Sequence, residues 1–270
     1  MAEAEAAALL ARLQLEGARS DADIVLGLDT NLTAAARETG LFAPHGIAAD
    51  LDLPIIWDDA EFLPFDWGYF AFVGNKGAAE ANSLRDLAAG DFKIIIQDPR
   101  SSTPGLGLLM WVKAAHGDEA PAIWEALADN IVTVTPGWSE AYGLFLEGEA
   151  DAVLSYTTSP AYHLIAEEDD TKDAAVFDEG HYLQIEVAAR IASSDQGELA
   201  DMFLEFLTGD IVQSVLPTTN WMYPAVIPEI GLPEGFDTLS VPETALLYPS
   251  GEAVTAREAA LQKWLTALSQ

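Results

Sequence analysis

The sequence FKIIIQDPRSSTPGLGLL at residues 92–109 runs from a β-branched apolar segment through a polar turn into a helix-like segment. Ser102 and Thr103 supply hydroxyls of the kind that cap helices, and the proline that follows them suits a first helical turn. Gly105 and Gly107 leave that turn without side chains, so we expect a ligand to reach its backbone amides. Since a helix N-terminus attracts anions, the stretch predicts a strand, an anion-binding turn and a helix.

Two further segments repeat this pattern. TPGWSEAYG at 135–143 follows an apolar run, and we expect Ser139 to cap the helix beside Trp138. SYTTSPAYH at 155–163 leads from another such run into a hydroxyl-rich turn. If all three runs are strands of one sheet, their helix N-termini converge at its C-terminal edge, where open α/β sheets bind ligands.

The rest of the chain alternates in the same way and predicts an α/β fold with parallel sheets buried on both faces. We expect strands at 23–29, 67–73, 92–98, 131–135 and 151–157. We expect helices at 3–16, 104–115, 119–128, 139–147, 160–168, 198–207 and 254–268, with a Pro- and Gly-rich segment at 224–250 along the surface. The chain opens on a helix where such folds open on a strand, so we expect a first strand upstream of it.

Composition narrows the class of protein. The 270 residues exceed the usual size of one domain, ~150 residues, and indicate two lobes. With 12 basic and 44 acidic residues the net charge is −32, which argues against a nucleic-acid partner and indicates a cationic partner, life in high salt, or both. No cysteine is present, and the four histidines lack zinc-ligand spacing. We find no secretion leader and no apolar run long enough for a membrane helix.

Aromatic residues cluster around the same turns and suggest the ligand. Trp138, Tyr156, Tyr162, Trp221 and Tyr223 lie in or beside loop-like segments. Aromatic faces in an acidic protein suit a planar organic cation, and the helix caps suit an anionic tail.

Motifs of catalysis are missing. Ser159 and His163 are four residues apart, but nothing marks a third group that would orient them as nucleophile and base. Acidic runs such as Asp58-Asp59 indicate solvated surfaces, so we predict neither catalytic residues nor a metal site.

Six long segments give the chain a family resemblance: PFDWGYFAFV, IIIQDPRSSTPGLGLL, TVTPGWSEAYGLFLEGEAD, VLSYTTSPAYH, EGHYLQIEVAAR and PTTNWMYP. Together they resemble the periplasmic thiamine-binding proteins of bacterial ABC transporters. The resemblance implies a type II periplasmic-binding-protein fold, two α/β lobes joined by crossing strands that close on a ligand between them. Residues 1–72 and 188–270 would form the first lobe, lacking its first strand, and 73–187 the second.

The resemblance also implies a binding site and partners. Ser102 and Thr103 match hydroxyls on the phosphate side of the ligand, and Tyr162 and Trp221 match aromatic residues that flank the thiamine rings. The other matching ligand-binding residues are Trp138, Tyr156, Thr157, Thr158 and Ser159. The protein would bind thiamine, thiamine phosphate or thiamine diphosphate in the periplasm, without catalysis or cofactor. It would act as a monomer that delivers the ligand to a membrane permease with its ATPase subunit.

Two alternatives stay open. A binding protein of the same fold could take another small cation, such as a polyamine or an iron complex. A thiamine-degrading enzyme of similar fold is the less favoured alternative, because that family uses a nucleophilic cysteine and this chain has none.

Overall fold

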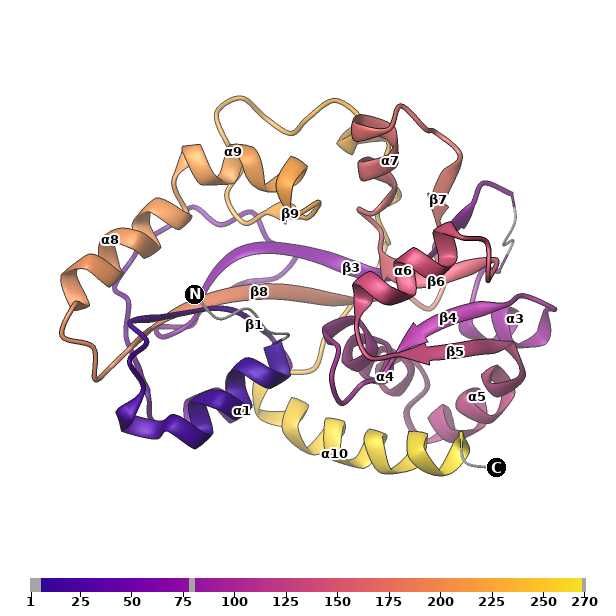
Figure 1. Cartoon of the computed structure of the whole chain (residues 1–270), viewed down its shortest axis with the longest axis horizontal. Helices are drawn as coiled ribbons and strands as arrows, with labels where there is room; N and C mark the ends of the chain where they lie inside the picture. The colour runs from indigo at the N-terminus through magenta and orange to yellow at the C-terminus, as the bar shows by residue number, and fades with distance from the viewer. Residues whose placement is uncertain (1–5, 78–80, 269–270) are drawn as a thin grey trace. The chain divides into compact units, whose positions relative to one another are not determined.

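The computed structural model describes residues 6–77 and 81–268, which form two compact units (Figure 1). Unit 1 comprises residues 1–68 and 184–237, and unit 2 comprises 69–183 and 238–270. Two long strands, β3 (Leu63–Asn75) and β8 (His181–Ile191), contribute to both units. Both strands are buried along nearly their whole length, as their apolar sequences require.

Unit 1 is built on the first part of β3 and the last part of β8. Strands β1 (Ile24–Asp29) and β2 (Phe42–Ala43) pair antiparallel with β8, and β9 (Tyr223–Pro224) pairs antiparallel with β3. Its helices are α1 (Ala6–Glu16), α2 (Thr33–Glu38), α8 (Gly197–Leu207) and α9 (Asp210–Thr219), with 3-10 turns at Gly17–Arg19 and Phe236–Thr238. The expected start of the first helix at residue 3 lies outside the described residues. A core packs α8 and α9 against the strands through Leu63, Phe65, Ala188, Leu204, Leu207 and Leu216.

Unit 2 has the strand order β3-β6-β4-β5. Strands β4 (Ile94–Gln97), β5 (Ile131–Thr135) and β6 (Ala152–Tyr156) are mutually parallel, and β7 (Lys172–Ala174) pairs antiparallel with β3. The short β10 (Ala245–Leu246) runs parallel to β8. Its helices are α3 (Leu84–Ala89), α4 (Thr103–His116), α5 (Ala120–Leu127), α6 (Trp138–Leu146), α7 (Pro160–Ala166) and α10 (Ser250–Ala267), with 3-10 turns at Gly117–Glu119 and Ala128–Asn130.

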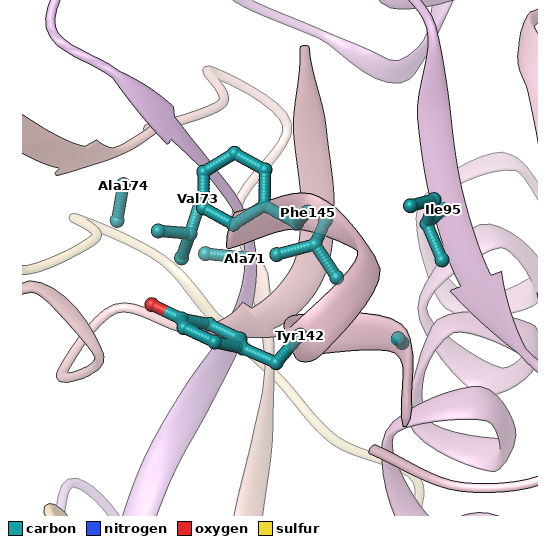
Figure 2. Close-up of a cluster of buried hydrophobic side chains, with 8 residues drawn as sticks. Ala71, Val73, Ile95, Tyr142, Phe145 and Ala174 are labelled. Atoms are coloured by element: carbon teal, nitrogen blue, oxygen red, sulfur yellow. The ribbon is translucent and has the colours of Figure 1, made fainter. Parts of the chain in front are cut away.

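One hydrophobic cluster of unit 2 lies between its sheet and helix α6. Tyr142 and Phe145 point from α6 toward Val73 of β3, and Ile95 adds the side chain of a second strand (Figure 2). Since α6 starts at the end of β5, this packing fixes where its first turn stands relative to the sheet.

The expectation of parallel sheets is wrong for most strand pairs, and the fold is mixed. Strand β3 pairs antiparallel with β6, and β1 pairs antiparallel with β8. Neighbouring strands that run parallel need a crossover connection, and the helices between β4, β5 and β6 supply it. Strand β3 instead enters unit 2 directly from unit 1, so its direction is not set by a crossover.

The C-terminal segment differs from the expected division, which placed residues 188–270 together. Helix α10 packs on α4 and α5, and the buried Trp264 meets Trp124 edge-on with ring centroids 6.5 Å apart. One face of α10 is buried there, so residues 238–270 belong to unit 2.

Candidate functional site

Three strand-to-helix turns of unit 2 lie at one edge of its sheet. Because β4, β5 and β6 are parallel neighbours, the starts of α4, α6 and α7 all stand at their C-terminal ends (Figure 1). This confirms the convergence expected from the sequence. The edge brings together Ser102, Thr103, Trp138, Tyr156, Thr157, Thr158, Ser159 and Tyr162. Trp221 belongs to unit 1, and its part in this site stays a prediction.

A hydrogen-bonded chain fixes two of these turns to each other. The Trp138 indole Nε1 donates to Ser155 Oγ at 2.8 Å, and Ser155 Oγ lies 2.7 Å from Ser159 Oγ. Ser159 Oγ also accepts from the Tyr156 backbone N–H at 3.2 Å. The start of α6 and the loop after β6 therefore hold one another in place.

Two buried hydroxyls at this edge lack partners. Ser102 is 2% exposed and Thr157 is 0% exposed, yet neither Ser102 Oγ nor Thr157 Oγ1 makes a hydrogen bond within residues 6–77 and 81–268. Leaving a buried hydroxyl without a partner costs ~1–3 kcal/mol. Sites that bind polar ligands tolerate this cost, because the ligand supplies the missing partner.

The capping predictions were wrong in detail. Helix α6 begins at Trp138 with Gly137 as its N-cap, so Ser139 lies inside the helix. Ser102 occupies the N-cap position of α4, but its side chain makes no capping hydrogen bond. Ser159 precedes α7, and its hydroxyl forms hydrogen bonds with Ser155 Oγ and the Tyr156 backbone N–H instead of capping the helix.

We expected the two glycines of α4 to open its first turn to a ligand, and this expectation is wrong. A Cβ on Gly105 would stand 2.5 Å from the Gln97 carbonyl oxygen, and one on Gly107 would stand 2.0 Å from the Phe70 ring. Both glycines are buried. They allow α4 to pack against β3 and the end of β4, and this close packing sets where Ser102 and Thr103 lie.

Tyr162 is half-buried and belongs to a polar network on α7. Its hydrogen bond to Glu167 raises the pKa of its phenol. Glu167 Oε2 also lies 2.7 Å from His163 Nδ1, and His163 Nε2 lies 2.9 Å from the Tyr142 hydroxyl. Burial raises the pKa of Tyr142, so its phenol stays protonated at neutral pH.

This network argues against two alternative uses of His163. Ligand atoms of His163, Glu167 and Asp169 lie within 4.8 Å of one another, as in a metal site. Both His163 nitrogens, however, already have hydrogen-bond partners. Ser159 bonds elsewhere as well, so the described residues show no Ser159–His163 pair of nucleophile and base.

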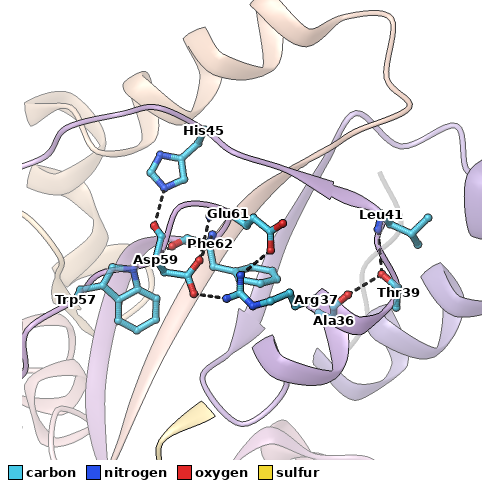
Figure 3. Close-up of polar contacts among 9 residues, drawn as sticks. All are labelled: Ala36, Arg37, Thr39, Leu41, His45, Trp57, Asp59, Glu61 and Phe62. Carbon is cyan, nitrogen blue, oxygen red and sulfur yellow. Dashed lines mark hydrogen bonds and ion pairs between the residues drawn. The ribbon is translucent and has the colours of Figure 1, made fainter. Parts of the chain in front are cut away.

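Asp59, of the acidic pair Asp58-Asp59, is engaged in contacts within unit 1. Asp59 Oδ2 pairs with Arg37 at 2.5 Å, while Asp59 Oδ1 accepts from the backbone N–H groups of Glu61 and Phe62 (Figure 3). Asp59 Oδ1 therefore holds its own loop, and Asp59 Oδ2 ties that loop to helix α2.

Sequence reasoning missed Asp66, a fully buried carboxylate in unit 1. It lies in β3, and its Oδ2 accepts from Asn220 Nδ2 at 2.6 Å. Burial raises the pKa of Asp66 to about 7, although the bond to Asn220 acts the other way. The available signal was an acidic residue inside the apolar run PFDWGYFAFV.

None of the helices in the described part of the chain is both long and apolar enough to span a membrane.

Comparisons with known proteins identify the family of the chain. The family described as "Bacterial extracellular solute-binding protein" matches residues 2–218. The "Thiamine-binding periplasmic protein" of Escherichia coli strain K12 is 52% identical, over 97% of this chain and 81% of its own length. That of Brucella abortus is 50% identical, over 100% of this chain and 82% of its own length.

Solved structures show the same fold. A "Periplasmic thiamin binding protein" has 51% sequence identity and a TM-score of 0.95, covering 100% of this chain and 86% of its own. A ferric binding protein from Campylobacter jejuni has a TM-score of 0.78 at 21% identity, over 98% of this chain and 89% of its own. At that identity the second likeness shows the fold alone.

Proposed function

The chain belongs to the family of bacterial extracellular solute-binding proteins, and we propose that it binds thiamine and its phosphate esters in the periplasm for an ABC transporter. Relatives at about half identity along nearly the whole chain carry the name of thiamine-binding periplasmic proteins. The permease and ATPase subunits, the monomeric state and closure of the lobes on the ligand stay predictions.

The observation that carries this proposal is the pair of buried, unpartnered hydroxyls at a sheet edge that also holds Trp138 and Tyr162. Ser102 Oγ and Thr157 Oγ1 can donate to the hydroxyl or phosphate oxygens of the ligand. The aromatic faces suit the thiazolium ring, which is planar and positively charged. This function needs no covalent bond to be made or broken, and we propose that the protein acts by binding alone.

Isothermal titration calorimetry with thiamine, thiamine phosphate and thiamine diphosphate tests the function. We expect saturable binding of thiamine, and no heat with putrescine or ferric citrate. Binding of putrescine without thiamine would favour the alternative of another cation. Release of free pyrimidine and thiazole from bound thiamine, detected by chromatography, would contradict binding without catalysis.

Variants of the two hydroxyls separate a ligand role from a structural one. Ser102→Ala and Thr157→Val each remove a buried group without a partner, so the ligand-free protein should be as stable as the wild type or more stable. The affinity for ligand should nevertheless fall by roughly tenfold per lost hydrogen bond. Thr39→Val is a matched control, because Thr39 Oγ1 already donates to the Ala36 carbonyl at 2.6 Å. That variant should lose stability and keep its affinity.

We also propose that the protein works at high ionic strength. Its net charge of −32 is spread over many carboxylates that outnumber the 12 basic residues. Salt screens their mutual repulsion. The melting temperature should therefore rise between low and molar sodium chloride.

A further inference from the structure

We propose that Asp66 is a positioning residue that holds Trp221 in its binding orientation through the hydrogen bond from Asn220. The proposal rests on the proposed function, in which Trp221 packs against the aromatic part of the ligand. It concerns one short turn of unit 1, residues 220–223, which we call the NWMY turn.

A hydrogen bond joins Asn220, at the end of α9, to Asp66 in β3. Asn220 is the residue at the C-terminal cap of α9, and its backbone N–H donates to the Leu216 carbonyl at 2.8 Å. Its side chain then reaches the fully buried Asp66 at 2.6 Å. A buried carboxylate is unfavourable unless it is hydrogen-bonded, so this contact ties the end of α9 firmly to β3.

The backbone of Trp221, the next residue, is strained. Trp221 has a φ of +58°, in the left-handed region that bulky side chains rarely adopt. Its own N–H donates to the Leu216 carbonyl at 3.2 Å. Such a conformation persists only where the surrounding structure imposes it. Because the indole of Trp221 is only half-buried, its burial does not account for the strain.

The other end of the NWMY turn, at Tyr223, is held by contacts with β3. Tyr223 stacks on Trp67 with ring centroids 4.6 Å apart and an interplanar angle of 25°. Strand β9 also pairs Tyr223 with Trp67 and Pro224 with Asp66. Two consecutive residues of β3 thus hold both ends of the NWMY turn, and Trp221 stands between these anchors.

The experiment is a double-mutant cycle read by thiamine affinity. Asn220→Ala removes the donor to Asp66 and should weaken thiamine binding by about tenfold. Trp221→Ala should weaken it at least as much. In the Trp221→Ala background, Asn220→Ala should have no further effect on affinity, because no indole remains to be oriented.

Asp66→Asn keeps an amide oxygen that can accept from Asn220 and should bind thiamine nearly as the wild type does, whereas Asp66→Leu should behave like Asn220→Ala.

Additive losses in the cycle, or wild-type affinity in Asn220→Ala, would overturn the positioning role. The control is Thr39→Val, which removes a hydrogen bond of unit 1 outside the NWMY turn. It should leave affinity unchanged, so a comparable loss there would attribute the effect to general loosening of the unit.

A second readout does not need the ligand and so separates this proposal from the proposed function. The difference in near-ultraviolet circular dichroism between wild type and Trp221→Phe reports a fixed indole. This difference should collapse in the Asn220→Ala background. If wild type fails to bind thiamine but the signal collapses, the function is wrong and the positioning stands; a signal that persists overturns the positioning.

Discussion

Replacing Gly105 by alanine should destabilise the protein, although alanine is the better helix former. The added Cβ would stand 2.5 Å from the Gln97 carbonyl oxygen and 2.8 Å from the Asp98 carbonyl carbon, where real contacts are essentially never below 3.0 Å. These are backbone atoms at the end of β4, so no side-chain rotation relieves the clash. The first turn of α4 must move away from the strand, and overpacking of this kind costs ~1–3 kcal/mol.

The control is Gly143→Ala in α6, where the structure shows no heavy atom within 4 Å of the new Cβ. That change should stabilise the protein by roughly 0.5–1 kcal/mol, as glycine-to-alanine changes in helices usually do. Urea unfolding of both variants measures the difference directly. Calorimetry should show that Gly105→Ala also weakens thiamine binding, because the shift carries Ser102 with it. Equal stability of the two variants would refute the claim that close helix–strand packing requires Gly105.

Other expectations concern pH and backbone strain. Because burial holds the pKa of Asp66 near 7 and an unfolded aspartate titrates near ~4, the folded state binds more protons between these values. Asp66 alone should therefore lower the free energy of unfolding by up to about 4 kcal/mol from pH 4 to pH 7, measured in urea titrations as the pH-dependent difference between wild type and Asp66→Asn. His181 contributes in the opposite sense: burial lowers its pKa to about 4, so the stability of the wild type relative to His181→Asn should fall as pH falls from about 6.5 through 4. At the strained position, Trp221→Gly should be more stable than Trp221→Ala by ~1 kcal/mol in thermal melts, whereas at Trp138, inside α6, the order should reverse.

Much of the site could be predicted because its chemistry lies in contiguous segments. The apolar runs before Ser102, Trp138 and Tyr156 each predicted a strand, and parallel pairing then determined that their ends meet. Local sequence was enough here, since strand, turn and helix are consecutive.

What could not be predicted depends on contacts between distant residues. Whether Gly105 faces solvent or the end of β4 depends on how close α4 packs, and no local pattern records that distance. Asp66 meets Asn220 across 154 positions of sequence. Helix α10 carries too weak an apolar stripe to show which unit it covers, and the edge contact of Trp264 with Trp124 decides this only in three dimensions.

Each of the two units contains segments that are far apart in the sequence, and this affects when each unit can fold during synthesis. Unit 1 lacks its second part until residue 237 has been synthesised, and unit 2 lacks α10 until residue 267. Neither unit can complete its core until most of the chain has been synthesised, and contacts between such distant segments form slowly. A chain arranged in this way should therefore remain unfolded until its synthesis is nearly complete.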